Sequence, residues 1–578
     1  MKLLLSSVFG PYGVDDEYGE KENKMELFHN QVTREQGIFS YRFNHGSQGL
    51  YFLAENINVP TAVLDFPSFK RFKKELKKGY DYIGISFIIP NFKKAKAMAR
   101  AIREFAPESK IILGGHGVNI PNIESMIDHD FICHGEGVYF LRELFGEKVN
   151  KPIRHPLEFS SFNRQVMGAP WPSDSGILIP GVGCANKCRF CATSHFFGNY
   201  IPYLKTGQEI FDVCCRYEDE KNITEFGVLD ENFLKMKDRA LELLELMEKN
   251  DRHFNFAIFS SAETLKNIGD LDILVRMGVT FVWVGVESKK EIYAKNKDTD
   301  FQVLFMELKK RGISVLASLI LFLEKHDKDT IWEDVDFVTS LNPDYVQFSP
   351  LGPIPGTKLY ADYEKQGKLI KTVPYESQHG QKKIWFHHPH FTRDESEGFL
   401  RLAFEKDYTR NGASMLRAIK TIFGGYLYCR NHPDERIRRC SKEYKKRLKM
   451  TRYLLAASTL FVKNQQSGAL LREIKKSYQS QFGRMTVPTL LASALVVFFS
   501  VKEYLRCRFI GDLRVPKTSY RPLYKHYKHA DQRAISSYAH VAVPKIPYPW
   551  IQTPEPQCVL SADHHPEQRH TSSKFVTL

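Results

Sequence analysis

The first 150 residues alternate between short apolar runs and segments in which apolar side chains recur at helical spacing. Residues 81–88 have the length and character of a buried strand, and apolar residues within 95–105 repeat with the period of a helix. Residues 110–113 form the next apolar run. Strand, helix and strand in this order make a βαβ unit, which requires a parallel sheet with helices on its faces. The pattern predicts an α/β, Rossmann-like domain over residues 1–150.

The same alternation continues through the middle of the chain. Six strands are expected, at residues 176–180, 223–229, 254–259, 281–286, 313–322 and 345–349. Helical stretches separate them, near 207–218, 236–249, 263–277, 300–311 and 329–341. Six consecutive β/α units are most economically arranged as a parallel barrel or most of one. We therefore expect a partial (β/α)6 barrel of the TIM type over residues 172–365.

Small and polar residues follow the strands of the first domain. Ser86, the pair Gly114 and Gly115, and the pair Gly135 and Glu136 all stand at such strand ends. Ligands of parallel sheets bind beyond the carboxyl ends of the strands, and glycines let a large ligand approach the backbone. Tight turns would use the same glycines, so the pattern alone leaves both interpretations open. No G-x-G-x-x-G opens the first helix, which argues against a dinucleotide site.

Beyond the barrel, a mainly helical domain is expected over residues 366–512. Residues 485–501 are 17 uncharged residues between Arg484 and Lys502. A spanning helix needs about 20 apolar residues, and this stretch is shorter and contains Pro488. The pattern favours a buried or an interfacial helix over a spanning one.

Charge separates this last part from the rest of the chain. The 578 residues carry a net charge of +15, from 82 Lys and Arg against 67 Asp and Glu. Residues 401–530 hold 28 basic and 8 acidic side chains, a balance of +20, so the remainder nets −5. A basic region beside apolar helices suits peripheral contact with an anionic membrane, and a solvated basic surface packed on the barrel explains it equally well. No recognisable nucleic-acid-binding module accompanies it, so nucleic acid is not the expected partner.

Two further features of the sequence bear on organisation and location. Residues 513–578 are rich in Pro, Tyr and His and are expected to form a disordered tail. Ten cysteines are too few for a disulfide scaffold, and the first residues lack the long apolar core of a signal peptide. These observations predict a cytoplasmic protein, with membrane association depending on the basic region.

Three of the cysteines stand close together, in the spacing C-x3-C-x2-C. They are Cys184, Cys188 and Cys191, in the loop that follows the first barrel strand. Three thiolates in one loop can converge on a metal centre, and sulfur ligands favour iron–sulfur clusters, zinc or copper. A structural zinc site requires a fourth ligand, for which His195, Cys214 and Cys215 are the nearest candidates. The spacing by itself therefore leaves iron–sulfur and zinc open.

With these motifs in order, the segment 172–365 resembles the radical S-adenosylmethionine (SAM) enzymes, whose partial barrel holds a [4Fe–4S] cluster on C-x3-C-x2-C. Residues 230–233, 285–288 and 347–357 resemble the D-[DE]-N-F, G-[VI]-E-S and closing P-G-T motifs of that family. Residues 318–325 depart from it, because they lack a common glycine-proline turn. The resemblance implies that the three cysteines hold the cluster. The SAM contacts that it implies are Phe190, Asp230, Glu231, Glu287 and Ser288.

The first domain is similar to the cobalamin-binding domain that precedes many radical SAM barrels. The similarity lies in residues 49–54, 84–86, 114–116 and 134–137. It implies that Ser86, Gly114, Gly115, Gly135 and Glu136 contact cobalamin. No D-x-H-x-x-G is present, so cobalamin would bind without that motif's histidine on the cobalt. His116 and His134 are expected to be hydrogen-bonding or structural residues.

The resemblance implies an enzyme that cleaves SAM reductively to a 5′-deoxyadenosyl radical, with an electron donor such as flavodoxin or ferredoxin. The leading hypothesis is cobalamin-dependent methylation of an unactivated carbon in a lipid-like or other small-molecule substrate. A radical rearrangement or bond-forming enzyme, or a tRNA-modifying enzyme, without cobalamin is the alternative within this class. A zinc-stabilised protein that binds membrane or RNA is the alternative outside it. The sequence identifies neither the substrate nor a catalytic residue.

Overall fold

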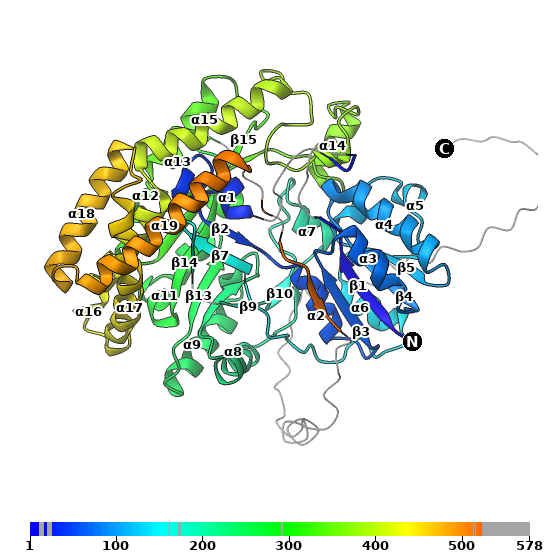
Figure 1. Ribbon diagram of the computed structural model, residues 1–578, viewed down its shortest axis with the longest axis horizontal. Helices are drawn as coiled ribbons and strands as arrows, with labels where there is room; N and C mark the ends of the chain where they lie inside the picture. Colours follow the sequence, from blue (N-terminus) through cyan, green and yellow to red (C-terminus); the bar gives the residue numbers. More distant parts are fainter. Residues whose placement is uncertain are drawn as a thin grey trace, which may run out of the picture.

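A computed structural model describes residues 1–10, 17–19, 26–160, 162–171, 175–290, 293–511, 514 and 516–522. The expected fold class is confirmed. Figure 1 shows an α/β part that contains the N-terminus, a second sheet at the centre of the molecule, and a layer of long C-terminal helices on the far side of that sheet.

The N-terminal sheet has six strands in the order β17-β3-β1-β4-β5-β6. Its parallel strands are β1 (Leu3–Ser7), β3 (Thr61–Asp65), β4 (Tyr82–Ser86), β5 (Lys110–Gly114) and β6 (Phe131–Ile132). The helices that connect them include α2 (Gln48–Glu55), α3 (Phe69–Leu76), α4 (Phe92–Phe105) and α6 (Gly137–Leu144). β1 is buried along its whole length because it lies between β3 and β4 with helices on both faces. The strand at 110–113 and the helix at 95–105 form as the periodicity predicts.

Part of the expected tail does not behave as predicted. Ser519–Arg521 form β17, which pairs antiparallel with β3 at the edge of the N-terminal sheet. The Arg521 guanidinium bonds the Glu158 carboxylate and lies 4.6 Å from the centre of the Tyr51 ring. An edge strand offers unpaired backbone groups, and a short polar segment satisfies them without any apolar pattern of its own. Residues 523–578 of the expected tail lie outside the described residues.

The central sheet has six parallel strands in the order β16-β15-β14-β13-β12-β9. They are β9 (Gly176–Leu178), β12 (Glu225–Val228), β13 (Asn255–Phe259), β14 (Val279–Glu287), β15 (Ser314–Leu321) and β16 (Tyr345–Pro350). The helices between them are α8 (Gly207–Lys221), α9 (Lys237–Lys249), α10 (Ala262–Ile268), α11 (Asp272–Met277), α12 (Phe301–Lys310) and α13 (Thr330–Ser340). β9 and β16 are its two edges, so the sheet is an open, partial barrel. The single helix expected at 263–277 is broken at Gly269, which adopts a φ of 84°.

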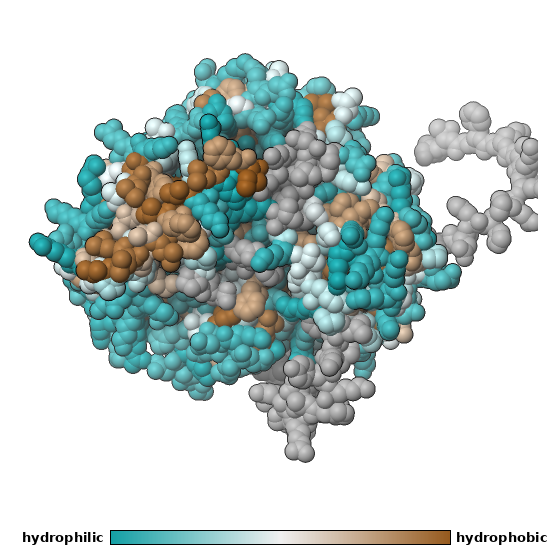
Figure 2. Space-filling view, viewed as in Figure 1, coloured by the Kyte–Doolittle hydropathy of each residue, from teal (hydrophilic) through white to brown (hydrophobic). Residues whose placement is uncertain are grey.

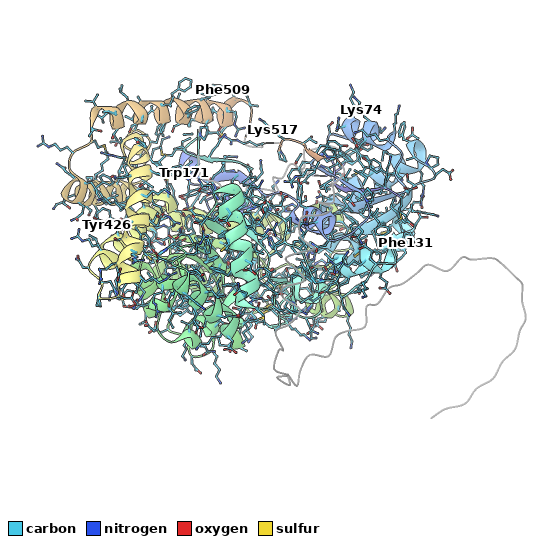
Figure 3. The ribbon with its side chains drawn as sticks, turned by 90° about the horizontal axis from the view of Figure 1, so that it is seen from below. Lys74, Phe131, Trp171, Tyr426, Phe509 and Lys517 are labelled. Atoms are coloured by element: carbon cyan, nitrogen blue, oxygen red, sulfur yellow. The ribbon has the colours of Figure 1, made fainter. Side chains whose placement is uncertain are left out.

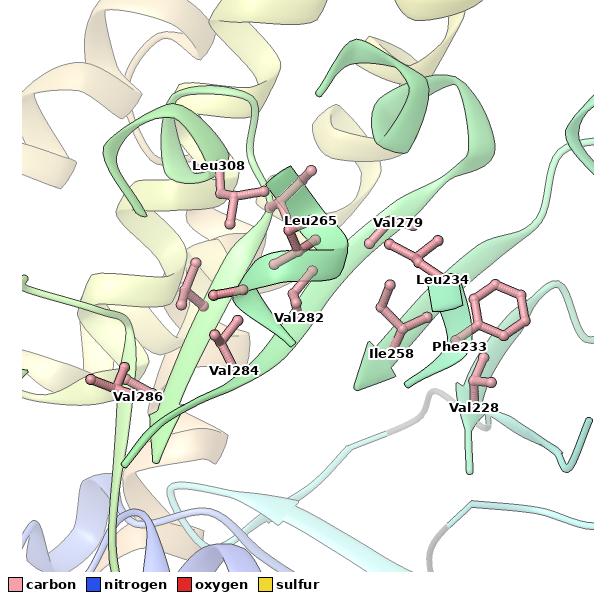
Figure 4. Close-up of a cluster of buried hydrophobic side chains, with 14 of the residues drawn as sticks. Val228, Phe233, Leu234, Ile258, Leu265, Val279, Val282, Val284, Val286 and Leu308 are labelled. Carbon is pink, nitrogen blue, oxygen red and sulfur yellow. The ribbon is translucent and has the colours of Figure 1, made fainter. Parts of the chain in front are cut away.

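The barrel core lies between this sheet and its helices (Figure 4). Val282, Val284 and Val286 of β14 are fully buried in this core, in a cluster with Leu265 and Leu308 of the neighbouring helices. Successive side chains of a strand point to opposite faces. The residues between these valines therefore point into the barrel, where they become available to a ligand.

Five helices complete the chain and confirm the mainly helical C-terminal region. They are α15 (Arg393–Asn411), α16 (Ser414–Arg430), α17 (Glu435–Ser458), α18 (Gln465–Phe482) and α19 (Val487–Phe509). α16 packs against α12, and an ion pair of 2.6 Å between buried Arg417 and Asp407 joins it to α15. Figure 3 shows α19 as the outermost element on one side of the molecule, with Phe509 near its C-terminal end.

α19 is held to the body by polar contacts. The Ser500 hydroxyl donates a hydrogen bond of 2.7 Å to the Met167 carbonyl, and the Glu503 carboxylate lies 3.6 Å from the Arg42 guanidinium. Glu503 also pairs with Arg506 of the same helix and with Arg514 just after it, at 3.0 and 2.5 Å. Burial would raise the pKa of Glu503, but the two arginines outweigh burial and lower the pKa to about 2.

We expect the attachment of α19 to weaken at acidic pH. An unfolded glutamate titrates near about 4.3. Because the folded pKa is depressed, the stabilisation by Glu503 is present above that value and is lost as the pH falls toward about 2. Amide hydrogen exchange across residues 487–509 should therefore accelerate over this window, and Glu503→Gln should remove that pH dependence. Glu473→Gln, which breaks an exposed pair with Lys420, is the control and should leave it unchanged.

Candidate active site

A cavity of about 550 Å³ lies at the carboxyl ends of the barrel strands, where the barrel meets the N-terminal domain. All three cysteines of the C-x3-C-x2-C loop line it, together with residues that end β13, β14, β15 and β16. Ile88, Ile89, Pro90 and His116 close it from the N-terminal domain. Such a position, beyond the strand ends of a parallel sheet, is where the fold places ligands.

The cysteine loop is built by a short hairpin. After β9, β10 (Gly181–Val182) pairs antiparallel with β11 (Ile201–Pro202), and the loop and helix α7 (Ala192–Phe196) lie between them. Gly183 closes the hairpin with a φ of 82°, and a Cβ there would lie 2.1 Å from the Asn199 carbonyl oxygen. Only glycine permits this approach, because any side chain would clash with the backbone.

The three thiols are free and half-buried. Burial raises the pKa of Cys184 to about 11, and burial also raises the pKa of Cys188. Thiols in such surroundings stay protonated until a metal displaces the proton. The Cys191 amide donates a hydrogen bond of 3.0 Å to the Cys188 carbonyl, which holds the second half of the loop in a turn.

These residues fit an iron–sulfur cluster better than a single zinc ion. Over the described part of the chain, no three Cys, His, Asp or Glu side chains converge as one metal ion requires. Cys214, a candidate fourth zinc ligand, is fully buried in the hydrophobic core on α8. The resemblance to the radical SAM enzymes implies a cluster held on the three cysteines of C-x3-C-x2-C, and thiolates are the usual ligands of iron–sulfur clusters. Cys184, Cys188 and Cys191 would hold it.

The two carboxylates that follow β12 point in different directions. Glu231 lines the cavity, whereas the buried Asp230 lies behind it, bonded to Arg239 at 2.9 Å and to the Tyr200 hydroxyl at 2.6 Å. Solvent reaches Glu231 through the cavity. Burial by the surrounding protein and the neighbouring Asp230 carboxylate nevertheless raise its pKa, and a hydrogen bond from the Thr193 hydroxyl opposes the rise. Only Glu231 is placed to contact a ligand directly; Asp230 holds the loop from behind.

Of the two predicted residues at the end of β14, Glu287 lines the cavity and Ser288 does not. Glu287 lines the cavity in an unusual backbone conformation, with a φ of 66°, and its carboxylate bonds the Lys295 ammonium. Ser288 lies outside the cavity lining and accepts a hydrogen bond of 3.1 Å from the Lys290 amide. A left-handed glutamate costs backbone strain, which marks a functional position more often than a packing one.

Phe190 lines the cavity as predicted. Its ring packs edge-on against Tyr293 at 5.7 Å, so the aromatic face beside the cysteines is fixed. Lys295 was not predicted. It is largely buried, and its charge acts on both Glu287 and the Cys188 sulfur, which raises its pKa against the effect of burial. A buried cation beside sulfur ligands offsets the negative charge of a bound cluster.

A row of polar side chains crosses the interior of the barrel and was also not predicted. The Trp283 indole donates to Ser318, Ser318 donates to Gln347 at 2.7 Å, and the Gln347 amide donates to Gln31 of α1 (Leu27–Gln31) at 2.8 Å. All four line the cavity. For Trp283, Ser318 and Gln347 the signal in the sequence is the two-residue alternation of their strands, which points them into the barrel, whereas Gln31 lies on a helix.

A second cavity, of about 200 Å³, lies at the strand ends of the N-terminal sheet. It brings together every residue predicted to contact cobalamin, namely Ser86, Gly114, Gly115, Gly135 and Glu136. A Cβ built on Gly114 would meet only the Cys133 Cβ, at 3.9 Å, and so would project into the cavity. Glycines that keep a hollow open beside the strand ends fit a large cofactor such as cobalamin.

Glu136 has a structural task in this second cavity. Its carboxylate accepts hydrogen bonds from the amides of Val138 and Tyr139, at 2.9 and 2.6 Å, and from the Tyr203 hydroxyl. It thereby caps α6 and joins it to the cysteine hairpin, because Tyr203 follows β11. Burial raises the pKa of Glu136 and these hydrogen bonds oppose the rise.

The rings of His116 and Phe196 lie between the two cavities. Gly115 and Phe196 line the smaller cavity, and their neighbours His116 and Ser194 line the larger one. The His116 and Phe196 rings pack at 4.4 Å. Within the described residues His116 Nδ1 is buried without a hydrogen-bond partner, and burial lowers the pKa of the imidazole to about 4. His116 is thus a neutral ring between the two cavities, while His134 lies outside both linings.

Comparison with known proteins agrees with this site. Residues 178–338 match the Radical SAM superfamily. The chain is 25% identical over 319 residues to bacteriochlorophyllide d C-8(2)-methyltransferase of Chlorobaculum tepidum, covering 50% of this chain and 70% of that protein. It is 24% identical over 243 residues to an uncharacterized methyltransferase of Pyrococcus horikoshii, covering 41% of this chain and 51% of the relative.

A solved structure is also similar. The radical S-adenosylmethionine methyltransferase TsrM from Kitasatospora setae, with cobalamin and a [4Fe-4S] cluster bound, superimposes with a TM-score of 0.49 at 14% identity. The superposition covers 78% of this chain and 99% of that one.

Proposed function

We propose that this chain is a cobalamin-dependent methyltransferase of the radical SAM superfamily that acts on a small-molecule substrate, because residues 178–338 match that superfamily. The observation that best supports this proposal is that the two cavities lie on either side of one pair of packed rings. The larger cavity contains the cysteine loop, which the motifs assign to the cluster, and the smaller cavity contains the glycines assigned to cobalamin. The two cavities face each other across His116 and Phe196. The methyltransferase relatives from Chlorobaculum and Pyrococcus support the same reaction class.

The chain's own residues bind, orient and exclude water. When bound, the cluster and cobalamin supply the electron-transfer and methyl-carrier chemistry that amino-acid side chains lack. Cys184, Cys188 and Cys191 would hold the cluster. Glu231 offers a carboxylate to the SAM amino group, and Phe190 offers a ring face to its adenine. The expected electron donor is a small redox protein such as flavodoxin or ferredoxin.

The substrate would occupy the part of the large cavity that the cofactor residues leave free. The row from Trp283 to Gln31 supplies hydrogen-bonding groups on one side, and Ile88, Ile354 and Trp385 supply apolar surface on the other. A mixed lining of this kind suits a molecule with a large apolar part and a few polar groups. A lipid-like substrate meets that description.

Anaerobic reconstitution tests the proposal. With iron, sulfide, SAM, cobalamin and a reductant, the protein should become brown, retain cobalamin through gel filtration and form 5′-deoxyadenosine. Cleavage of SAM without cobalamin retention would replace methyl transfer by a rearrangement or bond-forming reaction. A colourless protein with stoichiometric zinc would remove the enzyme altogether.

Filling the small cavity should separate the two cofactors. Gly114→Val should remove cobalamin retention, because the new side chain points into the hollow, while folding is preserved since Gly114 lies in a strand. The measurement is the cobalamin absorbance that remains after gel filtration, expected to fall at least tenfold, with iron content unchanged.

The matched control is Gly227→Val, at another strand glycine whose Cβ would make only ordinary contacts, at 3.7 and 3.9 Å, and which lines neither cavity. Equal cobalamin retention in Gly114→Val and the wild type would contradict the assignment of this cavity.

A further inference from the structure

Helix α19 is turned with its polar side chains inward. Its buried residues are Thr489, Ser493, Ser500 and Glu503. Its exposed large side chains are almost all apolar and form one continuous face, which we call the apolar ridge: Val487, Leu490, Leu491, Leu495, Phe498, Val501, Tyr504, Leu505, Phe509 and Ile510. Figure 2 shows this ridge as a brown band across the visible surface. A helix of a water-exposed surface has the opposite orientation.

The orientation is built in by specific contacts. The inward hydroxyl of Ser500 bonds the Met167 carbonyl at 2.7 Å, and the inward carboxylate of Glu503 lies 3.6 Å from the Arg42 guanidinium. Gly168 has a φ of 74°, and a Cβ on it would lie 2.6 Å from the Phe499 carbonyl oxygen, so the helix backbone lies directly on this turn. Rotating the ridge inward would break the contacts of α19 with Met167, Gly168 and Arg42. The ridge is therefore the face that the fold presents to its surroundings.

The size of the ridge calls for a partner. Leu491, Phe498 and Phe509 are 69%, 61% and 79% exposed, whereas soluble monomers rarely show long contiguous apolar patches. α19 has 23 residues and so extends roughly 35 Å. Of the helices that the structure describes, it is the one long and apolar enough to cross a membrane, with a mean hydropathy of 1.4.

The contacts with the body argue against crossing. A spanning α19 would have to leave Met167 and carry Ser500, Glu503 and Lys502 into the hydrocarbon layer, where unpaired polar groups are expensive. A helix that stays attached along one side and exposes its apolar side chains along the other can instead lie flat at the level of the lipid headgroups.

Charge selects an anionic lipid surface over a second copy of the chain. Lys502 and Arg508 are exposed on α19 and Arg484 is exposed just before it, and none of the three forms a salt bridge within the described residues. Two ridges packed together would bring like charges into proximity, which disfavours the pair. Lipid phosphates would attract the same three side chains.

We propose that the apolar ridge docks the protein on an anionic lipid bilayer, with α19 lying in the plane of the membrane interface. The protein would then be a cytoplasmic enzyme held at a membrane surface, close to substrates that partition into lipid. The docking surface is separate from both cavities and does not depend on the proposed methyl transfer.

Vesicle flotation of the full, reconstituted chain tests the proposal. The protein should float with vesicles of phosphatidylcholine that contain 30% phosphatidylglycerol, and binding should fall several-fold when NaCl rises from 0.1 to 0.5 M, because salt screens the charges. Leu491→Glu/Phe498→Glu should lower the partition coefficient by at least roughly tenfold, since each side chain loses its apolar insertion.

The control is Val303→Glu/Met306→Glu, at two exposed apolar residues of α12 that are 49% and 55% exposed and lie away from the ridge. It should bind as the wild type does, and SAM cleavage should be equal in all three proteins, which shows that they are folded. Absence of vesicle binding by the wild type, equal binding by the ridge variant, or resistance to an alkaline carbonate wash would overturn in-plane docking. A wild-type dimer that the ridge variant converts to a monomer would assign the ridge to a second copy instead.

Discussion

Replacing Cys188 by alanine is expected to abolish SAM cleavage. Cys184, Cys188 and Cys191 line one cavity from a single loop, and over the described residues no other cysteine lines that cavity. A cluster held by two cysteines is lost or unstable, because each thiolate supplies one of its protein ligands. The variant should contain little iron after anaerobic reconstitution and should form 5′-deoxyadenosine only at the background rate.

Cys215→Ala is the matched control, because Cys215 is also a partly buried free cysteine but lies on α8, outside the cavity. It should keep its iron and its rate of SAM cleavage. Full iron content and an unchanged rate in Cys188→Ala would remove the assignment of the cysteine loop to the cluster.

The second large effect is on stability. Arg239→Ala is expected to destabilise the fold by about 3–5 kcal/mol, because it leaves the carboxylate of Asp230 buried without its partner. Arg239 also donates hydrogen bonds to the Tyr200 hydroxyl at 2.8 Å and to the Leu204 carbonyl at 3.1 Å, so several groups lose their partner together. Thermal unfolding should show a clear fall in the melting temperature.

Arg401→Ala, which breaks an exposed pair with Glu405, is the control and should change the melting temperature little. A melting temperature of Arg239→Ala equal to that of the wild type would show that the buried pair does not support the loop.

The same pair separates the two carboxylates after β12. Asp230→Asn should lower stability while SAM still binds. Glu231→Gln should weaken SAM binding roughly tenfold with the fold intact, since a charge-assisted hydrogen bond contributes about 1.5–3 kcal/mol. Isothermal titration with SAM measures the difference, and a larger loss of affinity in Asp230→Asn than in Glu231→Gln would reverse the assignment.

Much of the fold is predictable because its signals are local. The strands at 110–113 and 345–349 and the helix at 300–311 appear where their periodicity places them, within a few residues. The break at Gly269 was missed because apolar side chains recur on both sides of it. β17 was missed because a short polar strand is recognised only through its partner, β3, which lies over 400 residues earlier.

The candidate site divides in the same way. The cysteines, Phe190, Glu231 and Glu287 belong to contiguous motifs and all line the large cavity. Asp230 and Ser288 belong to the same motifs but face away from it. Trp283 and Lys295 belong to no motif, because Trp283 reaches the cavity from the inner face of β14 and Lys295 from a turn that folds back onto Glu287.

The sequence by itself determined the order of strands and helices, the cysteine spacing and the regional charge, since each depends on residues that are neighbours in the chain. Only the tertiary structure decided which of Asp230 and Glu231 meets the cavity, that His116 and Phe196 separate two cavities, and that α19 faces outward with its apolar side. The physical reason is that burial and side-chain direction follow from packing between distant segments. The apolar pattern of α19, taken alone, suits a buried helix as well as an interfacial one. Four polar residues of α19 face the body in the folded chain, and this leaves its apolar side exposed.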